Sequence, residues 1–168
     1  TIANNDARGK EAMRILMLAQ FYWPDVGGEE RHAQDLSEAL AARGHEVVVA
    51  TQAAPDLPNE EVKNGVRIVR LRSSMQRATF LFSTTRTHAS PLPDPELLIG
   101  LQRLANAFKP EIVHAHNWIV HSFTPLKRAS GAKLLLSLHD HSHICPRKTL
   151  LRGDVVCDGP ALGKCVSC

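Results

Sequence analysis

The stretch from residue 14 to residue 50 constrains the fold more than any other part of this sequence. It contains an apolar strand, a glycine pair, a helical pattern and a β-branched strand, at residues 13–19, 27–28, 29–43 and 47–50. Gly44 stands where a helix commonly ends, directly before the second strand. A strand, a helix and a strand in this order predict a βαβ unit, with two parallel strands and a right-handed crossover.

The glycine pair of this unit is a candidate ligand-binding turn. Adjacent glycines let the backbone turn sharply and approach a ligand closely. A helix that begins behind them directs free N–H groups and the positive end of its dipole into the same gap. Gly27 and Gly28 are therefore candidates to contact a phosphate or a sugar ring, with a purely structural turn as the alternative. The dinucleotide fingerprint G-x-G-x-x-G and the P-loop pattern are both absent from the sequence.

The rest of the chain continues the alternation of strands and helices. A half-exposed strand near the sheet edge is predicted at residues 66–72, with Arg67, Arg70 and Arg72 on a solvated face. A helix capped by Asp94 should run to Phe108. A strand at 112–116, one or two short helices within 117–131 and a buried strand at 133–138 should follow; residues 53–65 and 73–93 are predicted loops.

This element order predicts an α/β fold, a Rossmann-like doubly wound parallel sheet with helices on both faces. Residues 1–12 are predicted to form a flexible tail, and residues 13–168 a single domain that ends in a Cys-rich loop segment, 145–168. A chain of 168 residues with 43% apolar and 22% charged residues is long enough to bury one core. A net charge of +3 gives no argument for nucleic-acid binding. The absence of a long apolar run and of a signal-like segment predicts a cytoplasmic location.

Histidines lie at or just beyond the ends of two predicted strands. His114 and His116 flank Ala115 and should share one face of the sheet. The run 139–143 holds three more histidines, which would also share a face if the strand continued. Such a cluster could bind a metal through neutral imidazole rings, or donate hydrogen bonds to sugar hydroxyls or phosphate. Hydrogen-bonded structural histidines are the alternative.

The four cysteines all lie near the end of the chain, in the spacing Cys145-x11-Cys157-x7-Cys165-x2-Cys168. A C-x2-C pair is a common half of a zinc site, and four thiolates would complete a tetrahedral centre. The intervening residues offer little apolar material for a core, so a structural staple is expected. Structural zinc, free thiols or a disulfide, and an iron–sulfur centre all remain open.

Four stretches together carry a resemblance to a known family. The stretch RILMLAQFYWPDVGGEERHAQDLSEALAARGHEVVVAT resembles the opening of family 4 glycosyltransferases of the GT-B architecture. The stretch KPEIVHAHNW is similar to the fourth-strand motif of that family, and KLLLSLHDHSHICPR to its strand ending in His-Asp. The Cys-bearing segment CPRKTLL…CDGPALGKCVSC is similar to one found in a subset of these enzymes.

The resemblance implies a retaining transfer of a sugar from a nucleotide-sugar donor to an acceptor, in a cleft between two Rossmann-like domains. The N-terminal domain mainly supplies the acceptor site, and the other holds most of the nucleotide. Gly27 and Gly28 would then contact the donor phosphates or sugar, and His139 would contact the donor sugar near its reacting carbon. The acceptor side would be shaped by Tyr22, Trp23, His116, Asn117 and Trp118.

The same resemblance implies that this chain is an incomplete first domain that lacks the donor-binding domain and is inactive alone. No catalytic metal is required, so structural zinc at the cysteines is the only cofactor considered. The acceptor could be a glycan, a lipid-linked sugar or a small molecule. Phe80-Leu81-Phe82 hints at an apolar acceptor or a peripheral contact with the inner membrane face, with a buried turn as the alternative. A metal-dependent hydrolase built on the histidines and a non-catalytic zinc-stabilised binding module are the competing functions.

Overall fold

The computed structural model describes residues 11–25, 27–77, 88–145 and 147–168. Most of the predicted N-terminal tail and the whole Phe80-Leu81-Phe82 segment lie outside these residues. None of the helices in the described ranges is long and apolar enough to cross a membrane.

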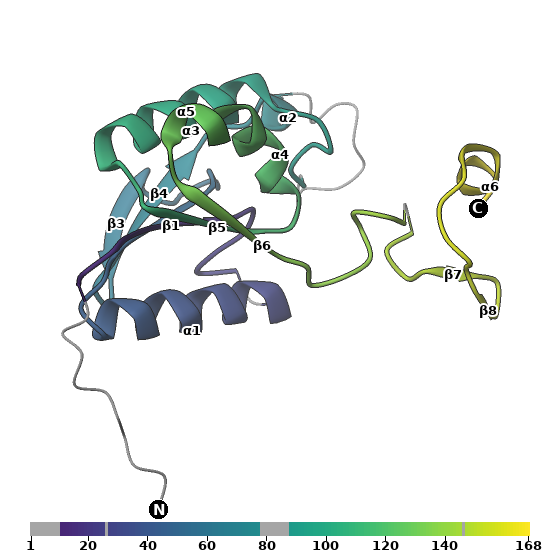
Figure 1. Ribbon diagram of the computed structural model, residues 1–168, viewed down its shortest axis with the longest axis horizontal. Helices are drawn as coiled ribbons and strands as arrows, with labels where there is room; N and C mark the ends of the chain where they lie inside the picture. Colours follow the sequence, from purple (N-terminus) through teal and green to yellow (C-terminus); the bar gives the residue numbers. More distant parts are fainter. Residues whose placement is uncertain (1–10, 26, 78–87, 146) are drawn as a thin grey trace, which may run out of the picture.

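A mostly parallel sheet forms the centre of the molecule (Figure 1). Its strand order is β3-β4-β2-β1-β5-β6, and only the β3–β4 pair is antiparallel. The strands are β1 Arg14–Ala19, β2 Glu46–Gln52, β3 Glu60–Lys63, β4 Val66–Leu71, β5 Ile112–His116 and β6 Lys133–Ser137. This arrangement confirms the predicted Rossmann-like α/β fold, with β1 in the interior of the sheet.

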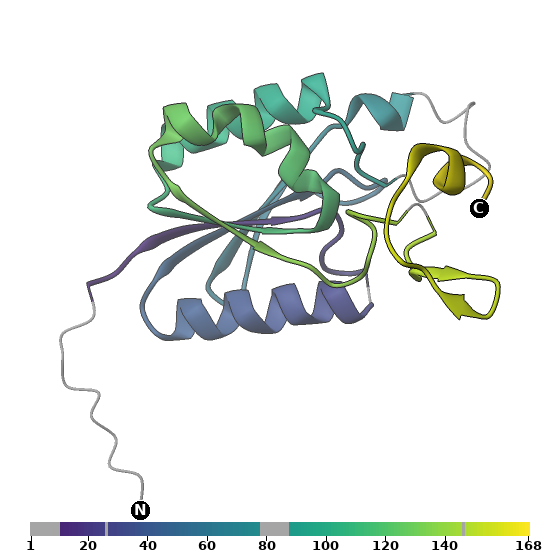
Figure 2. The ribbon, with the colours of Figure 1, turned by 45° about the vertical axis from the view of Figure 1, so that its right-hand side comes forward.

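Helices cover both faces of the sheet, as Figures 1 and 2 show. Helix α1 (Gly28–Ala42) lies on one face. The other face carries α3 (Pro95–Phe108) and a chain of short turns over residues 117–130. These turns are η2 Asn117–Ile119, α4 Val120–Phe123, η3 Thr124–Leu126 and α5 Lys127–Ser130. The prediction of interrupted helices here is confirmed, although Thr124 donates its hydroxyl to the Val120 carbonyl rather than capping a new helix.

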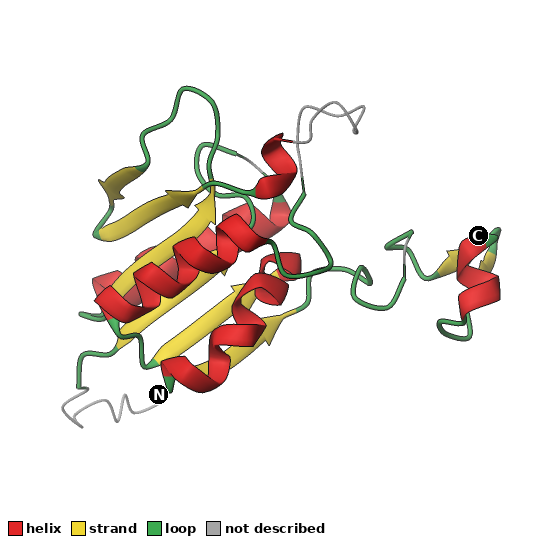
Figure 3. Ribbon diagram, turned by 90° about the horizontal axis from the view of Figure 1, so that it is seen from above, coloured by secondary structure: helices red, strands yellow, loops and turns green. Residues whose placement is uncertain are grey.

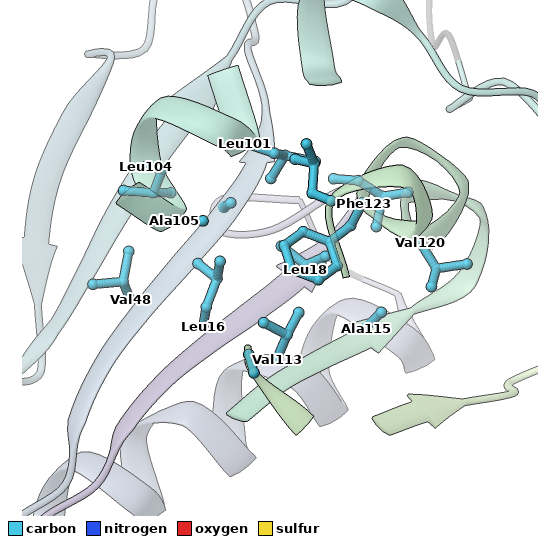
Figure 4. Close-up of a cluster of buried hydrophobic side chains, with 14 of the residues drawn as sticks. Leu16, Leu18, Val48, Leu101, Leu104, Ala105, Val113, Ala115, Val120 and Phe123 are labelled. Carbon is cyan, nitrogen blue, oxygen red and sulfur yellow. The ribbon is translucent and has the colours of Figure 1, made fainter. Parts of the chain in front are cut away.

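The two faces of the sheet bury separate apolar clusters because successive side chains of a strand point to opposite sides. Leu16 and Leu18 of β1 pack with Phe123 and Leu101 beneath α3 and α4, as Figure 4 shows. Met17, the residue between the two leucines, packs toward α1 instead. Strands buried on both faces need continuous apolar runs, which explains why the interior runs of β1 and β2 lack alternation.

Helix α3 begins where the sequence predicts. The Asp94 side chain accepts hydrogen bonds from the N–H groups of Glu96 and Leu97, and Pro95 occupies the first helical position. The same carboxylate also accepts bonds from Ser73 and from Ser74, the first residue of α2 (Ser74–Arg77). One side chain therefore fixes two helix starts.

The prediction for the β3–β4 edge was wrong in two respects. The predicted loop 53–65 contains strand β3, which forms a hairpin with β4 and takes the edge position. Arg70 is only 5% exposed, so it does not belong to a solvated basic face. Its guanidinium donates to the carbonyls of Pro58 and Trp23 and to the carboxylate of Glu61. The sequence pattern missed that the added edge strand brings a carboxylate to this arginine.

The prediction of a buried strand at 133–138 was also wrong in part. Strand β6 is an edge strand, and Leu135 and Leu138 are 54% and 62% exposed. The continuous apolar run suggested burial on both faces. However, β6 has only β5 as a neighbouring strand, and its leucines are left partly exposed to solvent.

The Cys-rich residues form a small unit beyond the carboxyl ends of the strands (Figure 1). It contains a short hairpin, β7 (Leu151–Arg152) and β8 (Val155–Val156), and one helical turn, α6 (Leu162–Val166). Figure 3 shows these elements set apart from the main sheet.

Candidate functional site

The carboxyl ends of β1, β2, β4, β5 and β6 lie along one edge of the sheet, where open parallel sheets commonly bind ligands. This edge gathers three of the predicted features. They are the glycine turn before α1, the end of β5 with the residues after it, and the loop that follows β6. Two parts can be distinguished, a histidine cluster and a large cavity.

The histidine cluster brings together side chains from three elements. His116, the last residue of β5, is fully buried, and its Nδ1 lies 2.8 Å from Nε2 of His139. The rings of His114 and His116 lie 4.4 Å apart between centroids, so the prediction of a shared face is confirmed. His32 of α1 lies 5.3 Å from the ring of His139 and 5.8 Å from that of His116.

Burial sets the protonation of the inner rings. Burial first, and then the charges that His114, His139 and His32 can carry, lower the pKa of His116 to about 3. Burial also lowers the pKa of His114, whose Nε2 lies 2.8 Å from the Ser137 hydroxyl. His116 is therefore neutral at physiological pH, and one of its two ring nitrogens carries the proton.

The position of that proton follows from the surroundings of His116. Its Nε2 is buried and has no hydrogen-bond partner among the residues that the structure describes. A buried nitrogen without a partner is tolerated better as an acceptor than as an N–H donor. The proton is therefore assigned to Nδ1, which donates to Nε2 of His139. The exposed His139 ring then carries its own proton on Nδ1, where it can donate to a ligand.

Asn117 connects β5 to the start of α1. It adopts a left-handed backbone conformation, with φ of 59°, which asparagine tolerates better than most residues. Its side-chain amide donates to Glu29 at 2.9 Å, and its carbonyl oxygen accepts from the Ser142 hydroxyl at 3.1 Å. Burial raises the pKa of Glu29, although the Asn117 bond and His139 oppose this shift. Asn117 is thus a structural connector that is 5% exposed.

The glycine turn lies beside two carboxylates and is therefore not a simple anion-binding site. A Cβ at Gly27 would lie 2.1 Å from Oε2 of Glu30, whereas a Cβ at Gly28 would meet nothing within 4 Å. Two carboxylates, Glu29 and Glu30, already occupy the first turn of α1. These charges interact with the positive end of the helix dipole and would oppose a second anion there.

A cavity of about 910 Å³ opens beside this turn, at the ends of β1, β2 and β4. Tyr22 and Trp23 line it together with three arginines, Arg70, Arg72 and Arg77. Tyr22 is 4% exposed, and burial, which outweighs the Ser37 hydrogen bond, raises its pKa to about 12. Trp23 is 37% exposed and offers an aromatic wall.

The predicted site residues therefore separate into groups. Asn117 directly follows His116 of the histidine cluster, Gly27 lies against the Glu30 side chain, and Tyr22 and Trp23 line the cavity. Trp118 does not line this cavity and packs, partly buried, against the apolar cluster beneath α3. The three histidines after β6 were expected to share a face only if the strand continued, and the strand ends at Ser137. His139 meets His116, while the ring of His143 lies 5.4 Å from that of His121.

Sequence reasoning missed Glu29 and His32. Both lie on the first turns of α1, three residues apart, and so share a helix face. That spacing directly after a glycine turn was a usable signal. Within the residues that the structure describes, no group of three or more His, Cys, Asp and Glu side chains is arranged to hold a metal ion.

Comparison with known proteins identifies a family and several relatives. Residues 26–155 match the model of Glycosyltransferase Family 4. A glycogen synthase of Mycobacterium tuberculosis is 31% identical over 138 residues, which cover 76% of this chain and 33% of that protein. A 2-deoxystreptamine N-acetyl-D-glucosaminyltransferase of Streptomyces fradiae is 29% identical over 147 residues, covering 76% of this chain and 34% of that protein. One phosphatidylinositol N-acetylglucosaminyltransferase chain of Arabidopsis thaliana is 28% identical over 136 residues, 77% and 28% of the two chains.

A solved structure supports the same fold. Sucrose-phosphate synthase from Thermosynechococcus elongatus superimposes with a TM-score of 0.59 at 19% identity, over 76% of this chain and 33% of that one. The fold is similar to that of GT-B glycosyltransferases. This chain belongs to glycosyltransferase family 4. It spans about a third of the length of the curated relatives it matches.

Proposed function

We propose that this chain is the acceptor-side domain of a retaining glycosyltransferase, which moves a sugar from a nucleotide-sugar donor to an acceptor. The observation that carries the proposal is the joint position of the His116–His139 pair and the 910 Å³ cavity at the carboxyl edge of the sheet. In this proposal a second Rossmann-like domain supplies most of the nucleotide site. The 168-residue chain alone is then inactive, because half of the donor pocket is missing.

His139 is the proposed catalytic contact to the transferring sugar. Its exposed ring presents Nδ1 as a donor, and His116 positions it by the 2.8 Å hydrogen bond at Nε2. A hydrogen-bond donor that the protein holds in a fixed position can stabilise the charge that develops on the transferring sugar. His116 itself is fully buried, so it would act through His139 rather than touch the acceptor.

The cavity is the proposed acceptor site. Trp23 lies in the wall of the cavity, and Lys63 Nζ covers one face of its ring at 2.9 Å from the centroid, so only the other face is proposed to pack against a sugar. Arg72, which directly follows β4, is an exposed cation. Arg77 is already paired with Glu96 at 2.8 Å. An aromatic ring and a cation in the cavity wall suit a polar acceptor that contains a ring. A glycan, a lipid-linked sugar and a small metabolite all meet this requirement.

The test joins this chain to a donor-binding domain of the family and measures nucleotide release from UDP-, GDP- and ADP-sugars with a panel of acceptors. The anomeric configuration of the product, read by NMR, tests retention. The chain alone should give no turnover with any donor. Efficient transfer by the isolated 168 residues would disprove the need for a second domain.

His139→Ala should lower kcat/KM of the joined protein by about 10²–10³, the usual effect of losing one transition-state donor. His141→Ala is the matched control, since His141 is also an exposed histidine of the same loop. Equal activities of these two variants would refute the role of His139. Failure of the joined protein to transfer any sugar would favour a binding module.

A further inference from the structure

The four cysteines gather around one small cavity in the segment beyond the sheet. The cavity has a volume of about 20 Å³, and all four cysteines line it, Cys145, Cys157, Cys165 and Cys168. A volume of this size admits about one sphere as large as a water molecule. The first and last of these side chains stand at opposite ends of the segment 145–168, so only the local fold brings them together.

Three short elements deliver the cysteines to the cavity. Cys145 follows the loop after β6, at a turn where the Lys148 N–H donates to its carbonyl. The β7–β8 hairpin then returns the chain, and Cys157 donates its N–H to the Leu150 carbonyl at 2.8 Å. Cys165 lies on α6, and Cys168 follows one turn later. A turn, a hairpin and a helical C-x2-C pair are elements from which small four-ligand metal sites are built.

The sulfur of one cysteine accepts a backbone hydrogen bond. The Sγ of Cys165 accepts from the Ala161 N–H at 3.4 Å. Hydrogen bonds of this kind orient a ligand atom before it binds a metal.

The segment has little else to hold it in one conformation. Its apolar side chains face solvent, with Val155 and Val156 70% and 72% exposed and Leu162 91% exposed. The hairpin has only two residues in each strand. A unit this small without a core needs a staple to keep a unique fold.

We propose that Cys145, Cys157, Cys165 and Cys168 bind one zinc ion as a four-thiolate structural centre. Zinc suits four thiolates in a closed tetrahedron with Zn–S distances of about 2.3 Å. The four residues are free cysteines, and among the described residues no three ligands already stand at metal-binding separation. Binding therefore draws α6 and the Cys145 turn toward the hairpin and closes the small cavity.

The centre would be structural rather than catalytic. All four positions of the tetrahedron are filled by protein, so no open site remains for water or substrate. Its expected effect is to order residues 145–168 at the edge of the sheet that carries His139. The inference stands apart from the transferase proposal because its test does not use transfer activity.

The test is metal analysis of the 168-residue chain, purified under reducing conditions and reconstituted with zinc. We expect one zinc ion per chain by mass spectrometry of the metal. Replacement by Co²⁺ should give sulfur-to-cobalt charge transfer in the near ultraviolet and the intense visible bands of a tetrahedral site. A chain without bound metal, two disulfides per chain, or an iron–sulfur spectrum would each overturn the proposal.

Variants distinguish loss of a metal ligand from a general loss of folding. Cys165→Ser should lose the metal, and Cys168→His should keep it with weaker charge transfer, because three thiolates and one imidazole also make a closed zinc site. Ser167→Ala is the control, since Ser167 is an exposed neighbour that lines no part of the cavity. If Cys168→His lost all metal while Cys165→Ser retained it, the proposed ligand set would be wrong. Far-ultraviolet circular dichroism would verify that the main sheet is intact in every variant.

Discussion

Arg70 offers the sharpest test of how this fold is held together. The side chain of Arg70 is 2% exposed, and its guanidinium satisfies two backbone carbonyls and the Glu61 carboxylate. Removing the guanidinium leaves these acceptors without their donor, including a carboxylate whose side chain is only 30% exposed. Breaking a buried ion pair by deleting one partner typically costs about 3–5 kcal/mol. Arg70→Ala should therefore lower the free energy of unfolding by about that amount.

The assay is urea unfolding followed by tryptophan fluorescence and circular dichroism. For a chain of this size a loss of about 3–5 kcal/mol also corresponds to a fall in Tm of roughly 6–20 °C. Arg67→Ala is the matched control on the same strand, because the Arg67–Glu60 pair is exposed, at 45% and 56%, and should contribute at most about 1 kcal/mol. A double-mutant cycle with Glu61→Gln separates the carboxylate from the two carbonyls. If Arg70→Ala and Arg67→Ala destabilised the protein equally, the inference of a buried anchor would be refuted.

Three other predictions concern the caps, the glycine turn and the buried histidine. Asp94→Ala should cost about 2 kcal/mol in urea unfolding, since the carboxylate caps α3 and also accepts from Ser73 and Ser74; an unchanged midpoint would contradict this. Gly27→Ala should lower Tm only slightly, because a Cβ would meet the movable end of the Glu30 side chain and displace it, whereas Gly28→Ala, with open space around it, should keep or raise Tm; the reverse order would contradict this. Unfolding stability should fall as the pH drops from 6.5 toward 3, since the unfolded chain protonates His116 while burial among His32, His114 and His139 keeps it neutral in the fold. His116→Phe should reduce this slope by up to about 1.4 kcal/mol per pH unit in urea titrations at several pH values, and an unchanged slope would contradict the assignment.

The pH effect has a defined sign. Above pH 6.5 neither state of the chain binds a proton at His116, so its contribution to stability is fully present. Below that value only the unfolded state takes up the proton, down to the folded pKa of about 3. The lowered pKa values of His114 and His121 act in the same direction, so His116→Phe should reduce the acid slope rather than remove it.

The elements that rest on local patterns were predictable from the sequence. The start of α3 follows from Asp94 and Pro95, whose chemistry acts within one helical turn. The interior strand β1 follows from an apolar run bounded by polar residues, because a strand covered on both faces has no polar side. The glycine turn and the histidines at the end of β5 could be assigned to one sheet edge, since parallel strands end at the same edge.

Features that depend on which segments meet were not predictable. Strand β3 has the composition of a loop, and only its pairing with β4 makes it a strand. Arg70 resembles its exposed neighbours Arg67 and Arg72 in sequence, and it is buried because Glu61 and the Trp23 carbonyl come from elsewhere to meet it. The exposure of Leu135 likewise depends on the edge position of β6.

The sequence by itself determined the βαβ start, the order of the elements and the membership in a glycosyltransferase family, because local propensity and motif spacing carry that information. Only the tertiary structure decided that His116 is buried beneath His139, that Glu29 is tied to Asn117, and that four cysteines spread over 145–168 share one cavity. Protonation and ligation depend on burial and on distances between side chains. Those quantities exist only once the chain has brought distant residues together.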